Sequence, residues 1–492
     1  MQKSPIHAGL RRFILRVNPC LSNAKRAFLF AACALGGGLL QAQPVPTSVQ
    51  QTPSGGWQLV RGGQPYYVNG AGGSVHMDQI VALGGNSLRT WGLEDAERIL
   101  DEAQKHGLTV MMGLWLQHER HGFDYSNADR VASQKENFRQ AVLRLKDHPA
   151  LLCWGVGNEV DLFYTNTDVW YAVEDIAKMI HELDPHHPTT TVTAGLDSNE
   201  VYLIKTRCPN IDIYSVNTYA DIDRLPGMLK KYGWDKSYLV TEWGPNGHWE
   251  VAKAPWGAPL EQSSAQKAES YGRRFAEKIL SEPACMGSYV FLWGQKQETT
   301  SSWYGLFSER GEPTEALVAV GNGWRLANAR AQAFADAAAP SPLDPRTQAG
   351  GGTAGRTFEA RQERPQVSVE SLDSLFYRAE AGAPRNVRVR GTWPENARFW
   401  LELVPESTDI KAGGDVESKP ATLLRKRVRF TADQPVVTFK APQVPGAYRI
   451  VVVAQGPNGY VAYANAPLWI NPRPPGARPR TWVDWETINR LD

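Results

Sequence analysis

The sequence predicts an α/β chain: a (β/α)8 TIM barrel followed by a linker and a C-terminal all-β, immunoglobulin-like sandwich. Between residues 66 and 324, short apolar runs alternate with helical segments, as the strands and crossover helices of a barrel do. Residues 326–365 turn to Ala, Gly, Pro, Gln and Arg, a composition typical of a linker. From residue 366 the pattern changes to short alternating strands separated by Pro, Gly and Asn turns.

Eight apolar runs are the expected barrel strands, because such runs are too short for helices and lack polar alternation. They are 66–72, 109–114, 151–156, 189–193, 213–217, 238–241 and 287–292, together with 84–92, which contains a turn and then the second strand. The expected helices are 78–83, 95–106, 134–147, 169–183, 225–232, 264–281 and a closing helix at 313–324. The sequence predicts no helix between the fifth and sixth strands, and a Gln/Pro/Ser-rich spacer before the first. The barrel domain should therefore cover residues 43–325.

The C-terminal domain is expected over residues 366–472, with a tail at 473–492. Its seven expected strands are 366–372, 386–391, 398–404, 426–430, 436–440, 448–454 and 460–470. Sugar binding and a plain packing role both remain open, because Trp393, Trp400 and Trp469 suit either a core or a binding platform. We expect this domain to be dispensable for chemistry, so that a chain ending near Arg325 keeps turnover on short oligosaccharides.

Residues 1–42 have the layout of a signal peptide: positive charges, then the apolar stretch AFLFAACALGGGLL, then a small residue at Ala42. This predicts a periplasmic or secreted protein, and the poor match of the box around Cys33 disfavours a lipoprotein anchor. The whole chain has a formal net charge of +2, and the leader carries Lys and Arg but no acid. The remainder is net negative, so nothing indicates a nucleic-acid partner.

The five cysteines do not describe a disulfide framework or a metal site. Two lie in the leader, and Cys153, Cys208 and Cys285 are widely spaced. Cys153 falls inside an expected core strand, whereas a bridge between Cys208 and Cys285 remains open. No metal-binding motif and no Gly-rich phosphate loop between a strand and a helix occurs in the sequence. We therefore expect neither a metal nor a cofactor.

Two glutamates stand where two expected strands stop. Glu159 lies in CWGVGNEV and Glu242 in YLVTEWG. In a (β/α)8 barrel the active site lies at the C-terminal ends of the strands, so these carboxyl groups can face each other across a cleft. Two facing carboxyl groups are the minimal apparatus for cleaving a glycosidic bond. The alternative is that each is an ordinary surface residue at a strand end.

The strings GNEV and TEWG resemble the retaining glycoside hydrolases of clan A, especially the family 2 barrel and the family 72 glucanosyltransferases. The likeness covers roughly residues 66–324 and leaves the sugar undetermined. It implies that Glu159 is the acid/base and Glu242 the nucleophile, at a separation of roughly 5 to 5.5 Å. The pKa of Glu159 is then expected to rise with burial.

The same resemblance implies supporting roles for further strand-end residues. Arg89 would lie beside the nucleophile, where a fixed positive charge favours the ionised carboxylate, and Tyr219 would donate a hydrogen bond to it. Asn158 would hold the 2-hydroxyl of the sugar, and Trp293 would form the aromatic platform beneath it. Asn217 stands where many clan members have a histidine, a departure that concerns the substrate contact and not the reaction class. The alternative for these residues is structural hydrogen bonding at the barrel rim.

More aromatic residues follow the expected strands, and some should extend the cleft while others belong to the core: Trp91, Trp115, Trp243, Trp249 and Trp303. After the third strand, His118 suits a sugar ligand or a loop support equally well.

Together these patterns predict a retaining enzyme that acts on a β-glucan or a related β-linked saccharide. Transglycosylation with the same residues is the first alternative, because water and a sugar hydroxyl can accept the same covalent intermediate. The alternative from another class is a catalytically silent carbohydrate-binding protein. Such a protein would need neither glutamate, so the presence of both together with Arg89 and Tyr219 favours an enzyme.

Overall fold

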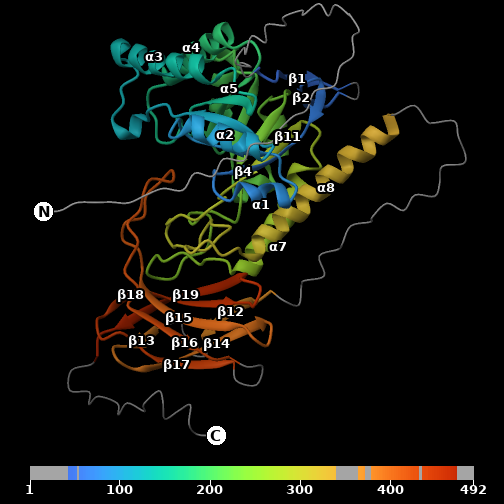
Figure 1. Ribbon diagram of the computed structural model, residues 1–492. Helices are drawn as coiled ribbons and strands as arrows, with labels where there is room; N and C mark the ends of the chain where they lie inside the picture. Colours follow the sequence, from blue (N-terminus) through green and yellow to red (C-terminus); the bar gives the residue numbers. More distant parts are fainter. Residues whose placement is uncertain (1–42, 53–54, 339–363, 372–377, 431–434, 474–492) are drawn as a thin grey trace, which may run out of the picture. The chain divides into compact units, whose positions relative to one another are not determined.

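The computed structural model describes residues 43–52, 55–338, 364–371, 378–430 and 435–473 (Figure 1). The expected signal peptide at 1–42, the linker segment 339–363 and the tail from residue 474 lie outside the described residues.

The barrel is closed by eight parallel strands in the order β10-β11-β4-β5-β6-β7-β8-β9. Their bounds are β4 Val68–Gly72, β5 Ser87–Arg89, β6 Thr109–Leu114, β7 Leu151–Val156, β8 Thr189–Ala194, β9 Ile213–Asn217, β10 Tyr238–Glu242 and β11 Cys285–Val290. Nearly every residue of these strands is buried, since helices cover the outside and side chains fill the inside. The predicted barrel is confirmed, although β11 begins and ends two residues earlier than expected.

Helices between the strands cover the barrel (Figure 1). They are α1 Met77–Ala82, α2 Ala96–Lys105, α3 Ala128–Leu145, α4 Val169–Leu183, α5 Ser198–Arg207, α6 Leu225–Lys231, α7 Ser264–Arg274 and α8 Glu315–Ala338. Apolar residues at helical spacing bury one face of α2, and a capping box between Ser263 and Gln266 fixes the start of α7. None of the described helices is both long and apolar enough to cross a membrane.

Some helical segments differ from the prediction, and α3 begins at Ala128 rather than at residue 134. The sequence indicated no helix after the fifth strand, but α5 forms there, begun by Asp197, whose side chain accepts from the backbone N–H of Asn199. Its apolar face is narrow, and Tyr202 is exposed, which hides the helical period. Helix α8 continues to Ala338, so the first part of the expected linker is helical.

The spacer predicted before the barrel is instead a three-stranded antiparallel sheet of β1 Thr47–Gln51, β2 Trp57–Arg61 and β3 Gln64–Tyr66. Gly62 and Gly63 both have positive φ, as the two-residue turn between β2 and β3 requires. Leu59 of β2 is fully buried in the cluster that fills the barrel interior. Tyr66 therefore belongs to β3 of this sheet and not to the first barrel strand, where the sequence had suggested it.

The C-terminal domain is a sandwich of two sheets, with orders β12-β14-β17 and β13-β19-β18-β15-β16. The strands are β12 Gln366–Ser371, β13 Arg378–Glu380, β14 Pro384–Thr392, β15 Arg398–Pro405, β16 Leu424–Val428, β17 Val436–Lys440, β18 Gly446–Gln455 and β19 Val461–Asn471. Alternating residues of both sheets share one core, which includes Val389, Leu401 and Val452. The predicted all-β domain is confirmed, with the short strand β13 added.

The three described cysteines, Cys153, Cys208 and Cys285, are buried and free. The bridge between Cys208 and Cys285 that the sequence left open is therefore absent. Burial raises the pKa of each of these thiols to about 12. All three remain protonated at neutral pH and act as small apolar side chains.

Candidate active site

Both glutamates line one pocket of about 770 Å³ at the C-terminal ends of the barrel strands. Residues at or just beyond the ends of six different strands contribute to its wall: Trp91, Trp115, Asn158, Glu159, Asn217, Tyr219, Glu242 and Phe291. The expectation that the two strand-end carboxyl groups share one cleft is met. A site of this size accommodates a ligand of one or a few sugar units.

Three side chains converge on the carboxylate of Glu242. The indole Nε1 of Trp91 donates to Oε1 at 2.7 Å, and Arg89 Nη1 donates to the same oxygen at 3.2 Å. The hydroxyl of Tyr219 donates to Oε2 at 3.0 Å. These donors hold the carboxylate in one orientation and place a full positive charge beside it.

Arg89 is itself fixed from several directions. It is 2% exposed, and its Nη1 also donates to the carbonyl of Thr241 at 2.7 Å. Its Nη2 donates to Asn158 Oδ1 at 2.5 Å. A guanidinium held in this way stabilises negative charge at Glu242 without having to reorganise during a reaction.

Glu159 lies in a different environment from Glu242. Its backbone is left-handed, with φ 51, and its amide donates to the carbonyl of Val192 at 2.9 Å. Its Oε1 accepts one hydrogen bond, from Asn217 Nδ2 at 2.8 Å. Burial, and next the charge of Glu242, raise the pKa of Glu159 well above its ordinary value. A positive φ at a non-glycine residue is uncommon, and residues in such strained conformations cluster at functional sites.

Asn217 connects the surroundings of the two glutamates. Its Nδ2 donates to Glu159 and, at 3.1 Å, to Asn158 Oδ1. Its Oδ1 accepts from Thr241 Oγ1 at 2.9 Å and from Arg89 Nη1 at 3.3 Å. A side-chain amide can donate and accept at once, so Asn217 joins the acid to the arginine that faces the other carboxylate.

We expect the high-pH limb of the activity profile to follow Glu159, because a general acid must be protonated to act. The amide of Asn217 favours the ionised form, so Asn217→Ala should raise the pKa of Glu159 further. The pH profile of kcat/KM should then lose activity at a higher pH than in the wild type, with a lower kcat. Asn458→Ala, in an exposed turn of the sandwich, should leave the profile unchanged. A limb that moves to lower pH in Asn217→Ala would contradict the acid role of Glu159.

Two of the expected aromatic site residues lie in the core instead. Trp293 is 1% exposed and stacks on Trp324 of α8 at 5.5 Å between ring centroids. Trp243 is fully buried against Tyr271 and Phe275. Neither side chain lines the pocket. Trp293 therefore does not form the aromatic platform that the sequence led us to expect. Trp293 lies three residues beyond the actual end of β11, and its indole packs toward α8.

The residues after β6 form a stack of aromatic rings behind the pocket wall. Trp115 lines the pocket, and His118 stacks on it at 4.8 Å with its ring nearly parallel. His118 is 1% exposed, and its Nδ1 accepts from Arg120 Nε at 3.0 Å. Burial lowers the pKa of His118 to about 4, so the ring is neutral at pH 7. Of the two roles left open for His118, this position matches loop support.

Several pocket residues were not assigned a role from the sequence. Trp91 was expected only as one of several aromatic residues near the cleft, and its hydrogen bond to Glu242 was not foreseen. Glu298 and Lys296 line the pocket from the loop after β11 and pair with each other at 3.1 Å. Residues 410–414 reach the pocket from the sandwich, for which no local sequence signal exists.

Comparison with known proteins agrees with this geometry. Residues 77–247, which contain both glutamates, match the family described as glycosyl hydrolases family 2, TIM barrel domain. The β-glucuronidase of Sus scrofa is 23% identical over 314 residues, 57% of this chain and 43% of that protein. Mannan endo-1,4-β-mannosidase F of Aspergillus clavatus is 26% identical over 233 residues, 43% of this chain and 49% of that protein.

Among solved structures, a β-D-glucuronidase from Dictyoglomus thermophilum aligns with a TM-score of 0.46 at 18% identity, covering 57% of this chain and 53% of that one. This chain covers less than half the length of the two curated relatives. The family 2 resemblance inferred from the two glutamate motifs is confirmed for the barrel by the family match.

Proposed function

We propose that this protein is a retaining β-glycoside hydrolase. The match of residues 77–247 to the TIM barrel domain of the family 2 glycosyl hydrolases supports this proposal. Glu242 attacks the anomeric carbon while Glu159 protonates the departing oxygen, which gives a covalent glycosyl-enzyme. Glu159 then takes a proton from water, and the hydroxide so formed releases the sugar.

The observation that carries this proposal is that two carboxyl groups in one pocket have different hydrogen-bonding surroundings. Glu242 accepts from Trp91, Arg89 and Tyr219, as an ionised nucleophile requires. Glu159 accepts from one neutral amide, and burial and the charge of Glu242 raise its pKa. Two carboxyl groups in such different surroundings match an acid and nucleophile pair.

The charges of the pocket favour a neutral sugar. Five carboxyl residues line it, against two lysines, Lys296 and Lys411. Lys296 pairs with Glu298, and Lys411 donates to the carbonyl of Val416 and pairs with Asp409. Because these cations and Arg89 already have acidic partners, a uronic acid would find no unpaired cation for its carboxylate among the described residues of the pocket. We therefore favour a β-glucan or a related neutral saccharide over a glucuronide.

Transglycosylation is the second candidate, supported by exposed aromatic side chains at the pocket. Trp249 is 53% exposed and Phe163 is 69% exposed, and both line the pocket. An aromatic face can hold the apolar C–H face of an acceptor sugar, which then competes with water for the intermediate.

The proposal is tested with the 4-nitrophenyl β-glycosides of glucose, mannose, galactose and glucuronic acid, together with cellotetraose, laminaritetraose and mannotetraose. We expect turnover of at least one neutral sugar, with β-anomers appearing first by NMR, and slower or no turnover of the glucuronide. Products longer than the substrate, detected by mass, would indicate transglycosylation. First-formed α-anomers would exclude retention. Binding of these saccharides without any turnover would instead favour a carbohydrate-binding protein.

A further inference from the structure

A loop of the sandwich reaches the pocket that contains both glutamates. Residues 406–423 join β15 to β16, which are neighbouring antiparallel strands. Such hairpin connections usually need only about two to five residues. Five consecutive residues of this loop line the pocket: Ile410, Lys411, Ala412, Gly413 and Gly414.

The loop is bonded to the barrel on two sides. After β6, Arg120 Nη1 donates to Asp415 Oδ2 at 2.9 Å and to the carbonyl of Ala412 at 3.1 Å, and His121 Nε2 lies 2.9 Å from the same carboxylate. After β11, Lys296 donates to the carbonyl of Gly414, and the backbone N–H of Thr299 donates to Glu417 at 2.6 Å.

These anchors lie on opposite sides of two strands. The barrel order β11-β4-β5-β6 places β4 and β5 between them. The loop therefore joins the segments that follow β6 and β11 and forms part of the pocket wall.

Glycines allow the loop backbone to touch the barrel. Gly413 and Gly414 have φ 62 and φ 70, a left-handed conformation that other residues rarely adopt. A Cβ at Gly413 would lie 2.5 Å from Leu162 Cδ2 and 2.7 Å from Arg120 Nη2. A Cβ at Gly414 would lie 2.8 Å from Lys296 Nζ. The loop is thus packed directly against the residues that follow β6, β7 and β11.

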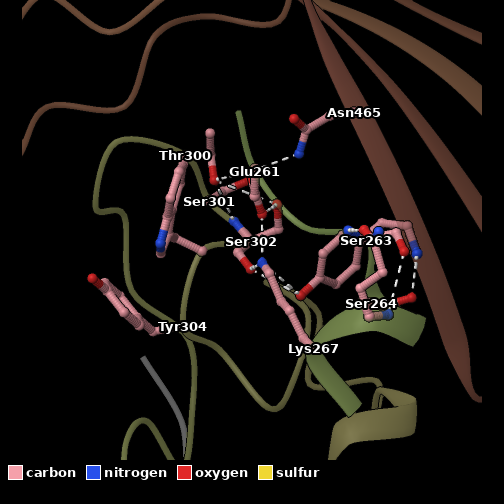
Figure 2. A network of polar contacts seen from close by, with 12 residues as sticks. Glu261, Ser263, Ser264, Lys267, Thr300, Ser301, Ser302, Tyr304 and Asn465 are labelled. Atoms are coloured by element: carbon pink, nitrogen blue, oxygen red, sulfur yellow. Dashed lines mark hydrogen bonds and ion pairs between the residues drawn. The ribbon is translucent and has the colours of Figure 1, made fainter. Parts of the chain in front are cut away.

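A second set of contacts holds the loop after β11 to the sandwich, as Figure 2 shows. Lys267 of α7 pairs with Glu261 at 2.6 Å, and both side chains are almost fully buried. Glu261 also accepts from Thr300 at 2.7 Å and from Asn465 of β19 at 2.6 Å. Tyr463 of β19 donates to the carbonyl of Ser302 at 2.8 Å. Because Asn465 and Tyr463 belong to the sandwich and Glu261 and Ser302 to the barrel domain, these contacts join the two domains.

We propose that the sandwich loop 406–423 forms a saccharide subsite of the cleft, next to the sugar that is attacked. Ile410 is 46% exposed and Phe163 is 69% exposed, and both line the pocket. A neutral β-linked pyranose held there buries its apolar C–H face against these side chains. The proposal rests on the proposed function. It also revises the expectation that a chain ending near Arg325 keeps its activity, because such a chain lacks this wall.

The test compares two substrates of the same sugar in the full chain. One is the cello-, laminari- or mannotetraose that the wild type cleaves; the other is the β-glycosyl fluoride, whose leaving atom is too small to fill the subsite. Ile410→Ala and Phe163→Ala should each lower the ratio of kcat/KM for the tetraose to kcat/KM for the fluoride about fivefold to tenfold, mainly through KM. Val416→Ala is the control, because Val416 is 84% exposed on the same loop and does not line the pocket.

Binding provides a readout that is independent of chemistry. In a Glu242→Gln background, calorimetry with the same tetraose should give a Kd about fivefold to tenfold weaker when Ile410→Ala is added, and no change with Val416→Ala. An unchanged ratio and an unchanged Kd would overturn the subsite, as would equal losses on both substrates. Absence of turnover of every tetraose and fluoride by the wild type would instead reject the proposed function.

Discussion

Replacing Glu242 with alanine is expected to lower kcat/KM by roughly four to six orders of magnitude on every substrate. The change removes the atom that forms the bond to the anomeric carbon, and it leaves Trp91, Arg89 and Tyr219 without their acceptor. Added azide should fit the vacated space and attack from the same face. The C–N bond then forms as the bond to the leaving group breaks, and the product is a glycosyl azide of inverted configuration.

Glu298→Gln is the matched control, because Glu298 also lines the pocket but has no role in the proposed displacement. Azide should give no glycosyl azide with this variant. Full activity in Glu242→Ala, or an azide product of retained configuration, would contradict the nucleophile assignment.

Replacing Glu159 with alanine is expected to separate substrates by their leaving group. A 2,4-dinitrophenyl glycoside departs without a proton, so the first step should be largely spared, whereas oligosaccharides should lose about 10² to 10⁴-fold in kcat/KM. Azide should then attack the accumulated glycosyl-enzyme from the face opposite Glu242, displacing its carboxylate. The product is a glycosyl azide of retained configuration, identified by NMR.

Asp161→Asn serves as the control for Glu159→Ala. Asp161 is a nearby acid that accepts from the backbone N–H of Ala194 and does not line the pocket. It should produce no glycosyl azide. If the two glutamate variants gave the opposite configurations, the roles of Glu159 and Glu242 would be exchanged.

The barrel and its carboxyl groups could be predicted because their signals are local. Each strand is a short apolar run, and the runs containing Val156 and Val240 stop close before a glutamate. In a parallel barrel all such ends meet at one rim, so proximity along the fold follows from position on each strand. Arg89, Asn158, Asn217 and Tyr219 were singled out by the family resemblance, and they do meet around the two glutamates.

The aromatic residues could not be assigned in this way. Trp91 and Trp293 both follow a barrel strand, yet Trp91 donates to Glu242 while Trp293 packs on α8. Successive side chains alternate between the two faces of a strand, so the direction of a residue just beyond a strand depends on where that strand ends. Strand β11 ends at Val290 rather than at the expected residue 292.

The contribution of the sandwich to the pocket also could not be predicted from the sequence. Residues 410–414 are separated by more than 160 positions from either glutamate, and their composition indicates only a loop. Their place at the pocket depends on contacts between domains, such as Arg120 with Asp415 and Lys296 with Gly414. These contacts join segments distant in the chain, which local patterns do not encode.

The central claim is that a covalent bond forms between the sugar and Glu242. Its most direct test is to incubate the protein with the 2,4-dinitrophenyl 2-deoxy-2-fluoro-β-glycoside of its preferred sugar, and then to locate the label by peptide mass spectrometry. The fluorine slows release of the intermediate more than its formation, so the labelled enzyme accumulates. We predict one fluoroglycosyl group per chain, attached to Glu242 and absent in Glu242→Ala. A label on Glu159, or rapid turnover to an inverted product with no label, would contradict the account.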